Sequence, residues 1–267
     1  MKPTNKVIVV TGAGSGMGRA LVLALLKRGA RVVAVDLNES TLKETVALAG
    51  AAGKVSAHVV NVSDRQAVEA LPAEVIAAHG AVDGIINNAG IIQPFVRMND
   101  LQYDAIERVL NVNHYGVIYM TKAFLPHLLQ RPEAHIVNVS SMGGFFPVPG
   151  QSLYGASKAG VKLLTEGLYS ELIDTNVRVT TVFPGAIATN ISQNSGVTIA
   201  APATSETAQS FPTTSAEDAA DTIIRGMEDD KFQVYIGNDA KMMNYLYRLN
   251  PRRATRFMYS RMKALLG

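Results

Sequence analysis

Short apolar segments rich in Val and Ile alternate with longer segments of helical periodicity along most of the chain. Seven apolar segments predict strands: Lys6–Thr11, Arg31–Asp36, Val55–Val62, Gly84–Asn87, His135–Ser140, Val177–Phe183 and Gln233–Ile236. Six others predict helices, with Asn38, Ser63 and Ser215 as caps: Met17–Arg28, Glu39–Ala49, Asp64–His79, Asp100–Leu129, Tyr154–Asp174 and Ala216–Met227. The alternation predicts one α/β domain with a doubly wound, seven-stranded parallel sheet, helices on both faces, and ligands at the carboxyl ends of the strands.

Two segments interrupt the alternation. Residues 190–214 are rich in Ser and Thr and carry one charge, so we predict a substrate lid there, with a disordered segment as the alternative. Residues 240–267 carry seven basic and no acidic residues, with two short helical patterns separated by Pro251. We therefore divide the chain into a main domain, residues 1–239, and a basic helical C-terminal extension, residues 240–267.

Composition excludes several classes of protein. The 267 residues include no cysteine, which rules out disulfides, thiolate zinc sites and cysteine nucleophiles. The five histidines show no ligand spacing, so we expect no metal site. The net charge of +3 comes from the extension, because the rest of the chain has 18 basic and 22 acidic residues. The chain contains no nucleic-acid-binding motif, so we expect no nucleic-acid partner. The polar N-terminus lacks a secretory apolar segment, so we expect a cytoplasmic protein.

A glycine-rich turn follows the first predicted strand. It runs from Thr11 to Gly18 and places Gly12, Gly16 and Gly18 in a T-G-x-x-x-G-x-G spacing. Glycines allow the backbone to approach a pyrophosphate closely, and the N–H groups that open the following helix attract its charge. The turn therefore predicts a dinucleotide site; a turn that only tightens the packing of strand and helix is the alternative.

Asp36 ends the second predicted strand, 18 residues past Gly18. A carboxylate at this place can accept hydrogen bonds from both hydroxyls of an adenosine ribose, and it repels a 2′-phosphate. Neither Ser15 nor Leu37 supplies a cation that would offset the repulsion. We therefore predict NAD as the cofactor in preference to NADP, with a solvated aspartate before a helix cap as the alternative.

Tyr154 and Lys158 are four residues apart in a predicted helix and therefore lie on one face of it. An ammonium group beside the phenol would lower a pKa that is ordinarily about 10. The spacing alone also arises by chance, as Tyr259 and Lys263 in the extension illustrate. The context separates the two pairs. Ser141 lies thirteen residues before Tyr154 at the end of a predicted strand, and Asn113 lies earlier still, whereas Tyr259 belongs to the basic extension.

Together these motifs resemble the short, single-domain branch of the short-chain dehydrogenase/reductase family over residues 5–238. The matching elements, in order, are Thr11–Gly18, Asn87–Gly90, Asn113, Ser140–Ser141, Tyr154–Lys158, and Pro184–Gly185 with Thr189. The resemblance implies a Rossmann-like, NAD-binding catalytic domain in which Tyr154 is the general acid/base. It also implies that Lys158 lowers the pKa of Tyr154 and binds the nicotinamide ribose, that Ser141 holds the substrate oxygen, and that Asn113 positions a water for proton relay.

The resemblance extends to the cofactor contacts. It implies binding by Gly12, Ser15, Gly16, Met17, Gly18, Asp36, Asn61, Val62, Asn88, Ala89, Gly90, Tyr154, Lys158, Pro184, Gly185, Ile187 and Thr189. Asn61 departs from the family, which usually has an aspartate there in contact with the adenine amino group. An amide oxygen can accept the same hydrogen bond, so we expect a slightly weaker adenine contact.

The residues expected around the substrate are mostly apolar. They are Gln93, Met142, Phe145, Phe146 and Gln151. No Arg or Lys is placed among them to meet an anion, so we predict a neutral, hydrophobic secondary alcohol or ketone as substrate. The alternative for the two phenylalanines is that they pack beneath the lid.

The sequence leaves alternatives open for the extension and for the function. The extension could form a subunit interface, a membrane-surface helix attracted to anionic lipid, or a loosely packed appendage. The resemblance implies a homo-oligomer, a dimer or tetramer, built from residues 100–129 and 154–174. For the whole chain we predict a reversible NAD-dependent alcohol dehydrogenase and ketone reductase. A ketoacyl-carrier-protein reductase and a non-catalytic NAD(H)-sensing regulator are the alternatives.

Overall fold

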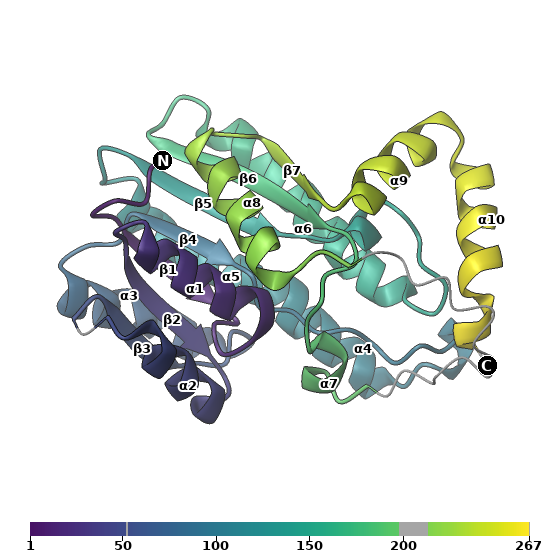
Figure 1. Cartoon of the computed structure of the whole chain (residues 1–267), viewed down its shortest axis with the longest axis horizontal. Helices are drawn as coiled ribbons and strands as arrows, with labels where there is room; N and C mark the ends of the chain where they lie inside the picture. Colours follow the sequence, from purple (N-terminus) through teal and green to yellow (C-terminus); the bar gives the residue numbers. More distant parts are fainter. Residues whose placement is uncertain (52, 198–212, 267) are drawn as a thin grey trace.

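The strands form one parallel sheet in the order β3-β2-β1-β4-β5-β6-β7 (Figure 1). The computed structural model describes residues 1–51, 53–197 and 213–266 of the chain. The strand order reverses between β1 and β4, which makes the carboxyl ends of these strands the expected binding crevice. The predicted doubly wound, seven-stranded sheet is confirmed, with strands β1 (Val7–Thr11), β2 (Arg31–Asp36), β3 (Val55–Val59), β4 (Gly84–Asn87), β5 (Ala134–Val139), β6 (Val177–Pro184) and β7 (Gln233–Ile236).

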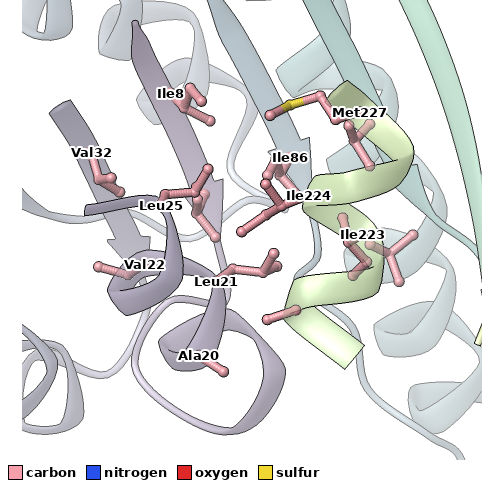
Figure 2. Close-up of a cluster of buried hydrophobic side chains, with 14 of the residues drawn as sticks. Ile8, Ala20, Leu21, Val22, Leu25, Val32, Ile86, Ile223, Ile224 and Met227 are labelled. Atoms are coloured by element: carbon pink, nitrogen blue, oxygen red, sulfur yellow. The ribbon is translucent and has the colours of Figure 1, made fainter. Parts of the chain in front are cut away.

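Helices cover both faces of the sheet. One layer holds α1 (Gly16–Lys27), α2 (Glu39–Ala49) and α8 (Ala216–Glu228), and the other holds α3 (Arg65–His79), α5 (Gly116–Leu128) and α6 (Ser152–Leu172). Alternate residues of each strand face opposite layers: Ile8 and Val10 pack toward the first, Val7 and Val9 toward the second. Figure 2 shows Leu21, Leu25 and Ile224 of the first layer meeting over the sheet.

The expected single helix over Asp100–Leu129 is wrong. The structure has a short 3₁₀ turn, η1 (Met98–Asp100), then α4 (Tyr103–Leu110), a π-helical turn, η2 (Asn111–Tyr115), and α5. A π turn inserts one residue into the hydrogen-bond ladder without changing the apolar periodicity much, so the pattern did not reveal it. Ser63 is also not the cap of α3; Asp64 is, because its carboxylate accepts from the N–H groups of Gln66 and Ala67. The caps Asn38 and Ser215 are confirmed.

The chain past β7 forms two helices and a final turn. Gly237, with φ +88°, precedes α9 (Asn238–Leu249); α10 (Pro251–Met262) and the 3₁₀ turn η4 (Lys263–Leu266) follow. The helical segment thus begins two residues before the expected boundary at residue 240. Figure 1 shows α9 and α10 beyond the carboxyl end of β7. Within the described part of the chain, no helix is long and apolar enough to cross a membrane.

Of the predicted lid, residues 198–212 lie outside the described residues. Its first part forms a short helix, α7 (Ile191–Asn194), after β6. Two contacts fix this helix beside the sheet. The Ser195 hydroxyl accepts a hydrogen bond from the N–H of Ile92 at 2.9 Å, and the Asn194 amide donates to the Ser15 hydroxyl at 2.8 Å. The start of the segment therefore lies against the glycine-rich turn.

Candidate active site

A cavity of about 740 Å³ lies at the carboxyl ends of the central strands. Every residue of the predicted cofactor-binding set lines it, from Gly12 to Thr189. The cavity is large enough for a dinucleotide-sized ligand, since ligand pockets span roughly 300–1,000 Å³. Sequence reasoning missed several wall residues that flank the predicted ones: Leu37, Asn38, Thr41, Val60, Ile91, Val112, Asn190, Ile191 and Asn194.

The glycine-rich turn forms one wall of the cavity. Gly12 and Gly16 have φ values of +68° and +50°, a region that side chains with a Cβ rarely adopt. At Gly18 a Cβ would overlap the carbonyl oxygen of Gly12, so glycine there allows α1 to start close beneath the turn. The first residues of α1 therefore line the cavity. Their free N–H groups and the positive end of the helix dipole would stabilise a pyrophosphate bound there.

The Asp36 carboxylate is held in place by the backbone around it. Its two oxygens accept hydrogen bonds from the N–H groups of Gly14 at 2.8 Å and Asn38 at 2.9 Å. Lys158 is the one cationic residue among those that line the cavity in the described part of the chain. The guanidinium of Arg19, which follows the turn, bonds the Gly14 carbonyl and Glu44. Asp36 thus gives this end of the cavity negative charge.

Asn61 turns its amide oxygen toward the backbone. This oxygen accepts from the N–H and the hydroxyl of Ser63, at 3.0 and 2.7 Å. Both lone-pair directions of the oxygen are used, and the expected bond from an adenine amino group has to compete with them. Asn61 lines the cavity together with Val62, and its contact with adenine stays a prediction.

Tyr154, Ser141 and Lys158 come together at the inner end of the cavity. The Ser141 hydroxyl forms a hydrogen bond with the Tyr154 phenol and accepts one from the N–H of Gly143 at 3.0 Å. Burial raises the pKa of Tyr154 above its ordinary value, and the Ser141 bond opposes the rise. Burial lowers the pKa of Lys158 to about 8, and its ammonium donates to the Val139 carbonyl at 2.9 Å.

The structure corrects one part of the predicted electrostatics. We expected Lys158 to lower the pKa of Tyr154, but burial dominates the pKa of Tyr154 and raises it, and the opposing influence is the Ser141 hydrogen bond. The physical reason lies in the placement of Lys158, which is itself fully enclosed and directed at a backbone carbonyl. Serine, in direct contact with the phenol, is therefore the partner that favours the phenolate.

Asn113 is completely buried in the π-helical turn. Its amide oxygen accepts from the N–H of Ile91 at 2.8 Å, and its amide nitrogen donates to the Ile91 carbonyl at 2.9 Å and the Ser157 hydroxyl at 3.1 Å. The side chain therefore joins α6 to the loop after β4 and does not line the cavity. Its part in a proton relay stays a prediction.

Gln93 has a different role from the one expected. It is buried, and its amide oxygen accepts from the N–H groups of Leu153 and Tyr154 at 2.9 and 3.0 Å, while its amide nitrogen donates to the Gly150 carbonyl at 2.9 Å. The N-cap residue of α6, Gln151, makes no cap bond of its own with its side chain. Gln93 thus caps the helix that carries Tyr154 from another loop and lines neither described cavity.

A second cavity, of about 220 Å³, adjoins the first. The two share wall residues at the reacting end: Ile92, Ser141, Tyr154, Pro184 and Gly185. The predicted substrate residues Met142 and Gln151 line the second cavity. The Gln151 amide nitrogen donates to the Gln93 carbonyl at 2.8 Å, and its buried oxygen has no hydrogen-bond partner among the described residues.

Phe145 and Phe146 line neither cavity, so the structure gives them packing roles in place of the expected substrate contacts. Phe145 packs edge-on against Phe183 and Tyr235, with ring centroids 5.4 and 5.9 Å apart. Phe146 is buried against Tyr247 of α9 at 5.6 Å. Their partners come from β6, β7 and the extension, which lie far away in sequence.

Asp239, in the first turn of α9, fixes the loop after β6. Its carboxylate accepts from the N–H of Ala186 at 2.7 Å. A Cβ at Gly185 would overlap this carboxylate, so a side chain there would displace Asp239. The start of α9 thereby holds the Pro184–Ala186 segment, which borders both cavities.

A dinucleotide-sized cavity lined by a half-buried tyrosine and serine pair, on a doubly wound sheet, defines a nicotinamide-dependent oxidoreductase with a Rossmann-like fold. The family model for short chain dehydrogenase matches residues 6–199. The chain therefore belongs to the short-chain dehydrogenase/reductase family, and the predicted resemblance is confirmed.

Curated relatives agree with this assignment. The chain is 39% identical over 256 residues to a Mycobacterium tuberculosis protein named "Putative oxidoreductase SadH", with 92% of this chain and 91% of the relative covered. It is also 39% identical over 196 residues to the 3-oxoacyl-[acyl-carrier-protein] reductase FabG of Thermotoga maritima, which covers 72% of this chain and 78% of that enzyme.

Solved structures share the whole fold. A short-chain dehydrogenase/reductase from Burkholderia phymatum, in complex with NAD, has a TM-score of 0.85 at 29% identity, covering 94% of this chain and 96% of that one. A short-chain dehydrogenase from Burkholderia cenocepacia, in complex with NADP, has a TM-score of 0.80 at 26% identity, covering 97% and 99%. Similar proteins thus hold either form of the nicotinamide cofactor.

Proposed function

We propose that this protein is an NAD-dependent oxidoreductase that interconverts a neutral, hydrophobic secondary alcohol and its ketone. The observation that carries the proposal is the position of Ser141 and Tyr154. Their hydroxyls are in hydrogen-bond contact and stand where the cofactor cavity meets the second cavity, whose lining is mostly apolar. A substrate oxygen placed between them would have its carbon open to both cavities.

The residues of the chain account for the proton in this reaction. As a phenolate, Tyr154 takes the hydroxyl proton of the alcohol, and Ser141 donates a hydrogen bond that steadies the substrate oxygen. Lys158 lies buried on the same helix and lines the cofactor cavity, where its ammonium would bind the nicotinamide ribose. The bound nicotinamide would supply the hydride acceptor, or the hydride donor in reduction.

Two observations support NAD. Asp36 presents negative charge at the end of β2, where the adenosine ribose would lie, and the described lining of the cavity contains no cation near it to accept a 2′-phosphate. Arg19, the basic residue behind the turn, is already bonded to Glu44. NADP would therefore meet repulsion without a compensating partner.

A neutral substrate is supported by the charge of the second cavity. Asp239 is the charged residue among its described lining, and it would repel an anionic substrate. A ketoacyl-carrier-protein reductase remains a second candidate, because the Thermotoga enzyme is 39% identical. Its substrate would have to bring a carrier-linked thioester to the same opening.

The test is formation of NADH from a panel of neutral secondary alcohols at mildly alkaline pH, with NAD and NADP in parallel. We expect turnover with NAD, at least tenfold lower kcat/KM with NADP, and loss of turnover in Tyr154→Phe. Equal kcat/KM for the two cofactors would refute the choice of NAD. Faster reduction of a ketoacyl thioester than of any simple ketone would favour the second candidate.

The outer face of α6 supports the expected homo-oligomer. Leu163 is 69% exposed there, Ile173 just past the end of α6 is 56% exposed, and Tyr115 at the end of the π-helical turn is also exposed. Large apolar side chains on neighbouring helices favour burial against a second copy of this chain. Light scattering should give a multiple of 28.5 kDa that Leu163→Glu lowers; a monomeric mass for the wild type would refute the expectation.

A further inference from the structure

Four methionines form much of the wall of the second cavity. Met142 belongs to the 3₁₀ turn η3 (Met142–Gly144) that follows Ser141, whereas Met243, Met258 and Met262 belong to α9 and α10. The sequence offered three alternatives for the extension, and none of them placed it at the active site.

The extension is firmly attached, so its wall is a fixed part of the site. Met243, Ala254 and Met258 are 1%, 4% and 2% exposed and form a small core with Phe146. Burial to this degree contradicts a loosely packed appendage. At the far end, Leu266 lies against Gly150, in the loop before α6.

The chemistry of the wall specifies what it can bind. Methionine side chains are apolar, unbranched and adaptable, so they pack against flexible hydrocarbon chains of varied shape. The exposed lining of the cavity is predominantly apolar, and its single described charge, Asp239, is bonded to the N–H of Ala186. A ligand here gains from burying methylene groups and has no cation to pair with.

We propose that α9 and α10 form a substrate-specificity pocket that takes a flexible, unbranched hydrocarbon arm attached to the reacting carbon. The proposal rests on the proposed function, and it adds the substrate class and the residues that select it. If one carbon needs about the 30 Å³ that a water molecule occupies in the liquid, 220 Å³ holds an arm of roughly seven carbons.

The position of the pocket sets the order of contacts along the substrate. Ser141 and Tyr154 border both cavities, so the substrate carbonyl would lie at the boundary between the two cavities. Its carbon would then be open to the cofactor cavity, and one of its substituents would enter the methionine-lined cavity. A methyl ketone with one long arm places that arm in the methionine-lined cavity, so a series of such ketones probes the cavity directly.

The experiment measures kcat/KM with NADH for methyl n-alkyl ketones of increasing length. Each methylene buried should raise kcat/KM by about fourfold, up to an arm of about seven carbons, where the increase should stop. Met262, at the partly buried rim, is the position to vary: Met262→Trp should end the increase at a shorter arm, and Met262→Ala at a longer one. Within each protein, kcat/KM for butan-2-one is the reference against which kcat/KM for the longer ketones is compared.

The matched control is Met242→Trp, the same substitution on α9 at a position that is 47% exposed and outside the cavity. It should reproduce the wild-type dependence on length. Two results would refute the proposed pocket. One is the same dependence of kcat/KM on ketone length in Met262→Trp and wild type; the other is no dependence on length in a wild-type protein that reduces butan-2-one.

A binding measurement separates the pocket from the proposed reaction. Calorimetric titration of the NAD-saturated protein with nonan-2-one reports occupancy without turnover, and we expect binding that weakens at least tenfold in Met262→Trp and is unchanged in Met242→Trp. This pattern without any turnover of ketones would refute the proposed function and leave the pocket standing. Turnover of short ketones with equal binding in all variants would refute the pocket alone.

Discussion

Replacing Gln93 with leucine should disable the protein without touching any residue that meets the substrate. The change removes an acceptor for the N–H groups of Leu153 and Tyr154 and a donor to the Gly150 carbonyl. Leucine fills a similar volume, so these three backbone groups would stay enclosed without partners. At about 1 kcal/mol for each group, the free energy of unfolding should fall by roughly 3 kcal/mol.

The same change should reduce catalysis beyond its effect on stability. The two N–H groups belong to the first turn of α6, and Tyr154 is in that turn, so a frayed turn displaces the phenol from Ser141. A displacement of this kind should lower kcat by about tenfold or more at temperatures where the variant is still folded. Because the substrate pocket keeps its wall, KM for the ketone should change less than kcat.

Urea denaturation and steady-state kinetics on the same preparations test both effects. Gln93→Glu retains acceptor oxygens for the helix N-terminus and should recover part of the lost kcat. Gln102→Leu, at an exposed position before α4, is the matched control and should behave as wild type. A stable Gln93→Leu variant with wild-type kcat would refute the view that this glutamine positions Tyr154.

Two further predictions concern buried charge and close packing. The pKa of Lys158 falls from 10.5 in the unfolded chain to about 8 in the folded chain. Between pH 8 and pH 10.5 the unfolded chain therefore binds this proton and the folded chain has lost it, so the free energy of unfolding rises with pH in this range. Urea unfolding without cofactor should give a gain of about 2 kcal/mol from pH 8 to 9.5 relative to Lys158→Met, and equal slopes in both proteins would contradict it. Gly185→Ala should cost about 1–3 kcal/mol and raise KM for NAD, because the new methyl group displaces the Asp239 carboxylate. The loss of stability should be smaller in an Asp239→Ala background. Gly167→Ala, where a Cβ meets no other atom, is the control and should cause no loss of stability in thermal unfolding. If the losses from Gly185→Ala and Asp239→Ala are additive, the clash between the two residues is refuted.

The parts of the fold that repeat a local pattern could be predicted from the sequence. Each strand is a short apolar segment, and the glycine-rich turn, Asp36 and Ser141 each lie at the carboxyl end of one. Because the strands are parallel, these residues could be placed together at the same edge of the sheet. The π-helical turn around Asn113 could not be predicted, because an inserted residue leaves the surrounding residues helical and amphipathic.

The residues around the substrate were harder to predict because their roles depend on contacts between distant segments. Gln93 caps a helix about sixty residues further along the chain, a partnership that no local pattern reports. Phe146 lies close to Met142 in sequence and would suit a pocket equally well, but Tyr247 of α9 covers it. Without the position of α9 and α10, the wall of the second cavity could not be assigned.

The placement of the methionine wall has a consequence for how this enzyme can diverge. Every predicted cofactor contact precedes residue 190, whereas three of the four wall methionines come from residues 243–262. Mutations in the last part of the gene can therefore reshape what the enzyme accepts while the nucleotide site is inherited intact. Asp239, in the first turn of α9, is the exception: its carboxylate holds the loop after β6, which borders both cavities, so selection on it should be stricter than on the wall methionines.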